Sequence, residues 1–148
     1  MQLLIEDLLT LSRIEAGAFR TSLTDIDLAA TVRGVVEDLS PAAAAAEIDL
    51  SADLATEPLT VAGDATQMSR ALLNLTGNAI KFTPGGGDVH VSLGPAPGTV
   101  GTPKPRALLT IRDTGIGIPA EDQSTIFTRF FRASNATTAN IHGTGSVW

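Results

Sequence analysis

Residues 74–84 read NLTGNAIKFTP, a helical pattern that ends at a proline. Within this stretch Asn74 and Asn78 are four positions apart, and Lys81 follows three positions later. This spacing places the three side chains on one face of a helix. An amide oxygen is a hard ligand suited to Mg²⁺ that is held mostly by phosphates and water, and a lysine supplies positive charge to phosphate oxygens. The pattern alone leaves two alternatives, a phosphate-binding helix and a solvated helix face.

Two further clusters follow along the chain. Residues 113–119 read DTGIGIP, in which the acidic residue after a strand can accept a hydrogen bond from an exocyclic amine. Gly115 and Gly117 would let the backbone approach a flat ligand, although Asp and Gly are equally common in plain turns. Residues 126–132 read IFTRFFR and contain three of the five phenylalanines, which the end of a core helix would also explain. No P-loop pattern occurs in the sequence.

The composition restricts the class of protein. The chain has 148 residues, of which 43% are hydrophobic and 18% charged, as expected of one globular domain. A net charge of −6 argues against nucleic-acid binding. The absence of cysteine excludes disulfides and thiolate chemistry, and two histidines are too few for a multi-histidine metal site. No apolar run is long enough to span a bilayer and no signal peptide is recognisable, so we expect a cytoplasmic location.

Hydrophobic periodicity predicts an α/β chain in which helices cover one face of a mixed sheet. Asp27 and Asp64 are the expected N-caps of two of the helices. The helices are predicted over residues 1–16, 28–46, 65–82 and 121–130, and the strands over 48–54, 59–62, 89–93 and 107–111. The Gly- and Pro-rich residues 94–105 are expected to form an exposed loop.

In their order and separation, the three clusters resemble the N box, the first glycine box and the F box of sensor histidine kinases. That family has a Bergerat-type fold, a two-layer α/β sandwich that binds ATP and is shared with gyrase, Hsp90 and MutL. Residues 3–17, LLIEDLLTLSRIEAG, resemble the end of the second dimerisation helix of these kinases. The resemblance thus implies the end of a dimerisation helix over residues 1–17 and an ATP-binding domain over 18–148. The alternative for the first segment is a short amphipathic helix that packs on its own domain.

The resemblance also implies a role for each matching residue. Asn78 would coordinate Mg²⁺ at the ATP phosphates with support from Asn74, Lys81 would contact phosphate, and Asp113 would bind the adenine amine. The other expected nucleotide contacts are Phe82, Gly115, Gly117, Ile118, Phe127, Phe130, Gly143, Thr144 and Gly145. Asn74 stands where the ATPase relatives carry a water-activating glutamate. Because an amide cannot take that proton, the resemblance implies phosphoryl transfer rather than hydrolysis.

Two features depart from the family pattern. Neither His90 nor His142 matches the family's phosphoacceptor, so we expect the acceptor histidine on a partner chain or a missing dimerisation domain, with a response regulator further along. Residues 143–148, GTGSVW, begin like the second glycine box and then the sequence stops. A sandwich that is incomplete at this end is therefore expected, and a homodimer could cover the exposed sheet. The alternative function is a kinase-derived binding module without catalysis.

Overall fold

The computed structural model describes residues 23–98, 101, 103, 106–126 and 134–135. Residues 22–115 form one compact unit, and the described residues from Ile116 onward belong to a second unit. The predicted helix over residues 1–16, Phe127, Phe130 and residues 143–145 lie outside the described residues. None of the helices within the described ranges is both long and apolar enough to cross a membrane.

The larger unit is built on a three-stranded mixed sheet with the order β2-β4-β5. Strand β2 (Asp49–Leu54) runs parallel to β4 (Asp88–Pro95), and β4 pairs antiparallel with β5 (Ala107–Asp113). A separate antiparallel pair joins β1 (Thr24–Asp27) to β3 (Thr60–Gly63). The four predicted strands are thus present within two residues of their expected ends.

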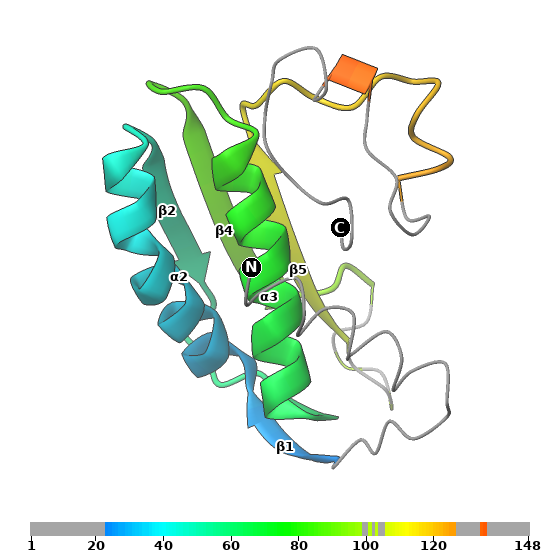
Figure 1. Cartoon of the computed structure of the whole chain (residues 1–148). Coiled ribbons are helices and arrows are strands. Elements are labelled where there is room, and N and C mark those ends of the chain that lie inside the picture. Colours follow the sequence, from blue (N-terminus) through cyan, green and yellow to red (C-terminus); the bar gives the residue numbers. More distant parts are fainter. Residues whose placement is uncertain (1–22, 99–100, 102, 104–105, 127–133, 136–148) are drawn as a thin grey trace, which may run out of the picture. The chain divides into compact units, whose positions relative to one another are not determined.

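Two helices, α2 (Leu28–Ala45) and α3 (Ala65–Lys81), lie side by side on one face of this sheet (Figure 1). Each begins at the predicted cap. The Asp27 carboxylate accepts a hydrogen bond from the Ala30 N–H, and the Asp64 carboxylate accepts one from the Gln67 N–H, both at 3.1 Å. These bonds satisfy backbone donors that the first turn of a helix leaves unpaired.

The core lies between the helices and the central strand. Along β4, Val89, Val91 and Leu93 are buried, whereas His90 between them is exposed on the other face. This alternation is the two-residue period of a strand with one buried face. The remaining buried core residues of the helices and of the segment that precedes β2 are Leu28, Ala29, Val32, Val35, Ala43, Ile48, Leu72, Ala79 and Ile80. The predicted two-layer α/β architecture is therefore confirmed.

The predicted helix over residues 121–130 is wrong for its described part. Residues 120–126 form successive turns, in which the Asp122 N–H donates to the Pro119 carbonyl and the Thr125 N–H to the Asp122 carbonyl. The Asp122 carboxylate also accepts bonds from the backbone N–H and the hydroxyl of Ser134, at 2.8 and 2.9 Å. The Thr125 hydroxyl donates to the Asp122 carbonyl at 3.0 Å, and a local bond of this kind competes with the helical hydrogen-bond ladder. The Asp122 carboxylate is held by a residue 12 positions later, a contact that helical periodicity cannot predict.

Candidate functional site

Helix α3 has two different faces. Leu72, Thr76 and Ala79 are buried toward the sheet and α2. Helical periodicity places Asn74, Asn78 and Lys81 on the opposite face. Asn74 and Asn78 are half-buried and Lys81 is exposed. A pair of partly desolvated amides beside a cation is thus held on a rigid element, which suits an anionic ligand that carries a hard cation.

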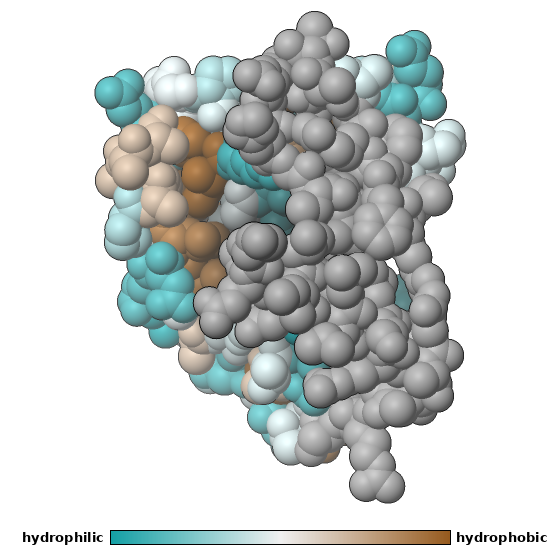
Figure 2. All heavy atoms as spheres, viewed as in Figure 1, coloured by the Kyte–Doolittle hydropathy of each residue, from teal (hydrophilic) through white to brown (hydrophobic). Residues whose placement is uncertain are grey.

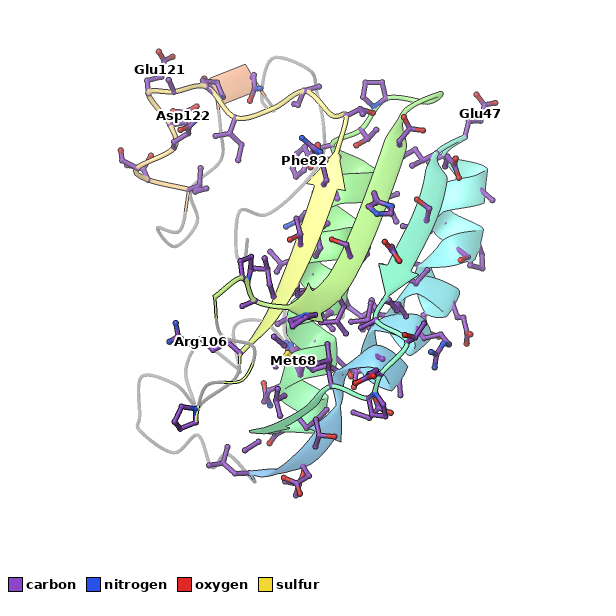
Figure 3. All side chains as sticks on the ribbon, turned by 180° about the vertical axis from the view of Figure 1, so that it is seen from behind. Glu47, Met68, Phe82, Arg106, Glu121 and Asp122 are labelled. Carbon is purple, nitrogen blue, oxygen red and sulfur yellow. The ribbon has the colours of Figure 1, made fainter. Side chains whose placement is uncertain are left out.

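The carboxyl end of α3 adds an aromatic ring to this face. Phe82 is the C-cap residue, and its backbone N–H donates to the Asn78 carbonyl at 2.9 Å. The Lys81 Nζ lies 5.2 Å from the centroid of the Phe82 ring, a distance at which the ammonium is attracted to the aromatic face. Figure 3 shows Phe82 at this end of the helix, next to the end of β5, with Met68 near the opposite end. Asn78, Lys81 and Phe82 therefore belong to one corner of the unit.

Asp113 and Gly115 approach the same corner from the sheet. Asp113 is the last residue of β5, and its Oδ1 accepts a hydrogen bond from the Gly115 N–H at 2.9 Å. A Cβ atom on Gly115 would lie 2.5 Å from the Phe82 carbonyl oxygen, which is too close for any side chain. Glycine thus allows the turn after β5 to touch the end of α3. Two motifs that are separated by about 30 residues in the sequence meet at this contact.

The second unit holds Gly117 and Ile118 in a turn of its own. Gly117 has a φ of +68°, which favours glycine. The Asn135 Nδ2 donates to the Gly117 carbonyl at 2.9 Å and to the Ile116 carbonyl at 3.3 Å. Sequence reasoning did not single out Asn135, because an asparagine in a polar stretch gives no signal of a bond to residues 18 or 19 positions earlier. Gly117 and Ile118 belong to this second unit, whereas Asp113 and Gly115 belong to the larger one.

Solved structures share the architecture of this chain. The structure of full-length ShkA in complex with AMPPNP matches it with a TM-score of 0.77 and 28% identity, over 96% of this chain and 27% of that one. The structure of the Acinetobacter baumannii histidine kinase AdeS matches with a TM-score of 0.69 and 27% identity, over 87% of this chain and 59% of that one. The fold is therefore that of histidine kinase catalytic domains.

Sequence comparison agrees with the structural comparison. Residues 63–147 match the family described as "Histidine kinase-, DNA gyrase B-, and HSP90-like ATPase", and the chain belongs to this family. It is 36% identical to the sensor histidine kinase RppB of Synechocystis sp. over 142 residues, which are 96% of this chain and 30% of RppB. It is 32% identical to the sensor protein kinase PmrB of Pseudomonas aeruginosa, over 96% of this chain and 28% of PmrB. The chain thus spans less than a third of the length of these two relatives.

Proposed function

We propose that this chain is the ATP-binding part of a sensor histidine kinase, which donates the γ-phosphoryl group of ATP to a histidine of a dimerisation domain. The observation that carries the proposal is the contact between Gly115 and the Phe82 carbonyl, because it joins the amide-bearing helix end to the acidic turn. The membership of the family and the similarity to sensor histidine kinases support ATP as the ligand. A response regulator would receive the phosphoryl group in a later step.

The amides of α3 fit a magnesium ion that is bound mainly through nucleotide phosphates. Their oxygens are neutral hard donors, and their partial burial keeps them from full competition with water. In the proposed site Asn78 holds the ion and Asn74 supports it, and Mg²⁺ supplies neutralisation of the phosphate charge. Lys81 contacts a phosphate oxygen, and the adjacent Phe82 ring helps to orient its ammonium.

Asp113 would recognise the purine. Its Oδ1 is engaged by the Gly115 N–H, and this bond orients the carboxylate so that Oδ2 can accept a hydrogen bond from an exocyclic amine. The other proposed nucleotide contacts are Phe82, Gly115, Gly117, Ile118, Phe127, Phe130, Gly143, Thr144 and Gly145.

The proposed division of the chain is a dimerisation-helix segment over residues 1–17 and an ATP-binding domain over 18–148.

The identity of residue 74 favours transfer over hydrolysis. Hydrolysis needs a base that takes a proton from water, and an amide such as that of Asn74 cannot take one. The contribution of these residues is therefore to position the nucleotide and to stabilise charge, while the acceptor histidine supplies the nucleophile.

A transfer assay tests this proposal. The chain is incubated with Mg²⁺, ATP labelled on its γ-phosphate, and a separately produced dimerisation domain that carries the histidine. We expect an acid-labile label on that domain, which Asn78→Ala abolishes. Gln67→Ala serves as the matched control, because Gln67 is a half-buried amide in the first turn of the same helix.

The alternatives give different results in the same assay. Nucleotide binding without any label on the partner would indicate a binding module rather than a kinase. Steady release of inorganic phosphate by the chain alone would indicate an ATPase of the gyrase or Hsp90 type. The absence of nucleotide binding altogether would contradict the proposed site.

A further inference from the structure

Thr114, which directly follows β5, forms hydrogen bonds with the first residue of β4. Its Oγ1 accepts a hydrogen bond from the Asp88 N–H at 2.9 Å, and its own N–H donates to the Asp88 carbonyl at 3.1 Å. Both backbone polar groups of Asp88 are therefore bound by one residue. Thr114 lies between Asp113 and Gly115. These bonds therefore fix the backbone next to Asp113, whose carboxylate is proposed to bind the purine.

The same attachment continues into α3 through Gly87 and Thr83. A Cβ atom on Gly87 would collide with the Thr83 Cγ2 and would lie 2.8 Å from the Thr114 Oγ1. Only a glycine therefore fits between the two threonines. The buried Thr83 Oγ1 in turn donates to the Ala79 carbonyl at 2.7 Å, in the helical turn that carries Asn78. A continuous series of close contacts thus connects the Asp113 segment to the amide-bearing turn of α3.

We infer that Thr114 is a positioning residue for nucleotide binding, which acts through Asp113 and sets the separation between this carboxylate and the amide face of α3. This inference rests on the proposed function. Thr114 itself is exposed, as is Asp88, so water can replace the lost hydrogen bond without a large effect on folding. Water would not hold the end of the strand at a fixed distance from α3. The loss should therefore appear in the recognition of the purine amine and not in stability.

The test compares three threonine variants of the chain by calorimetry with ATP and with inosine triphosphate, which lacks the exocyclic amine. Thr114→Val keeps the shape and removes the hydroxyl, Thr114→Ser keeps the hydroxyl, and Thr110→Val is the control at an exposed position of β5, the strand that Thr114 follows. We expect Thr114→Val to weaken ATP binding about five- to tenfold, as for the loss of one ordering hydrogen bond. Thr114→Ser should stay within about twofold of the unaltered chain, as should Thr110→Val.

Two further measurements separate a positioning role from a merely structural one. The affinity for inosine triphosphate should be unchanged by Thr114→Val, because the contact that the variant disturbs needs the amine. In a chain that already carries Asp113→Ala, Thr114→Val should have no additional effect on ATP affinity, since the two residues act in series. Thermal unfolding should show that all variants have the midpoint of the parent chain within about 2 °C.

The outcomes distinguish the inference from the function on which it rests. If Asp113→Ala leaves ATP affinity intact, the proposed purine site is wrong and the inference fails with it. If Asp113→Ala weakens ATP binding but Thr114→Val behaves like Thr110→Val, only the inference is overturned. Equal losses for the two nucleotides, or an added loss in the Asp113→Ala background, would show that Thr114 acts on the fold in general and would also overturn it.

Discussion

Helices α2 and α3 are built and packed in the same way but present different outer faces. They have 18 and 17 residues, each starts at an aspartate cap, and both lie on the same face of the sheet. Figure 2 shows apolar side chains interspersed with hydrophilic ones over α2, and a hydrophilic patch where the carboxyl end of α3 is visible. α2 buries Val32 and Val35, and its charged side chains, such as Glu37, are exposed. α3 adds the half-buried amides of Asn74 and Asn78 to a comparable buried stripe. Contact with water thus accounts for the charged residues of α2, whereas the half-buried amides of α3 are what the proposed nucleotide site would explain.

The largest effect should come from the amide face of α3. Asn78→Ala should weaken Mg²⁺-dependent ATP binding about 100-fold, in the range observed when a group that positions or stabilises charge is removed. Because Asn78 does not belong to the buried stripe, the free energy of unfolding should change by less than about 0.5 kcal/mol. Calorimetry and thermal unfolding measure the two quantities, with Gln67→Ala as the control. A large loss of stability with unchanged affinity would contradict the distinction between the two helices.

The core face of α2 should show the opposite behaviour. Val32 is 1% exposed, and Val32→Ala should lower the free energy of unfolding by about 2 kcal/mol through lost burial and a residual cavity. Val36→Ala, at a half-buried position of the same helix, should lower it by less. Denaturant unfolding gives these values. ATP affinity, measured well below the unfolding temperature, should stay the same in both variants, and a tenfold loss would show that α2 also takes part in the site.

A third comparison concerns two glycines of the larger unit. A Cβ on Gly115 would meet the Phe82 carbonyl oxygen and the Asp113 Oδ1 at 2.5 and 2.7 Å, whereas a Cβ on Gly94 would meet nothing within 4 Å. Gly115→Ala should therefore weaken ATP binding and lower the free energy of unfolding by about 1–2 kcal/mol. Gly94→Ala should change neither appreciably. Similar results for the two variants would contradict the contact between the turn after β5 and the end of α3.

The smallest expected effect is the loss of a helix N-cap, and it should be similar in α2 and α3. Asp27→Ala and Asp64→Ala each remove an acceptor for a backbone N–H of the first helical turn, and each should lower the free energy of unfolding by about 1 kcal/mol. Asp38→Ala, at an exposed position inside α2, is the control and should have an effect below about 0.5 kcal/mol. Affinity for ATP should be unaffected by all three variants. A much larger loss from one of the two caps would show that the helices are not equivalent in their anchoring.

Much of the fold follows from local patterns along the chain. The two N-caps, the end of α3 near Phe82 and the strand over residues 89–93 all depend on neighbouring residues, and each was predicted correctly. The failure at residues 121–126 has the converse cause, because there Asp122 bonds to Ser134, 12 positions away. A hydrogen bond at that separation leaves no periodic signal.

The candidate site likewise depends partly on local sequence spacing and partly on contacts between distant residues. The spacing of Asn74, Asn78 and Lys81 on α3 is a property of the sequence, since helical geometry alone places them on one face. The roles assigned to these residues stay predictions. No periodicity indicated that Thr114 bonds to Asp88 or that Asn135 reaches the turn at Gly117.

The amino-acid sequence by itself determined α2 and α3, most of the strands, the two caps and the polar face of α3, because each of these depends on side chains only a few positions apart. Only the tertiary structure decided that β4 lies between β2 and β5, and that the turn at Gly115 touches the end of α3. The physical reason is that strand pairing and close backbone approach depend on the partners available in three dimensions. Local propensity sets which segments can pair, and the shared burial of α2, α3 and β4 selects the arrangement that forms.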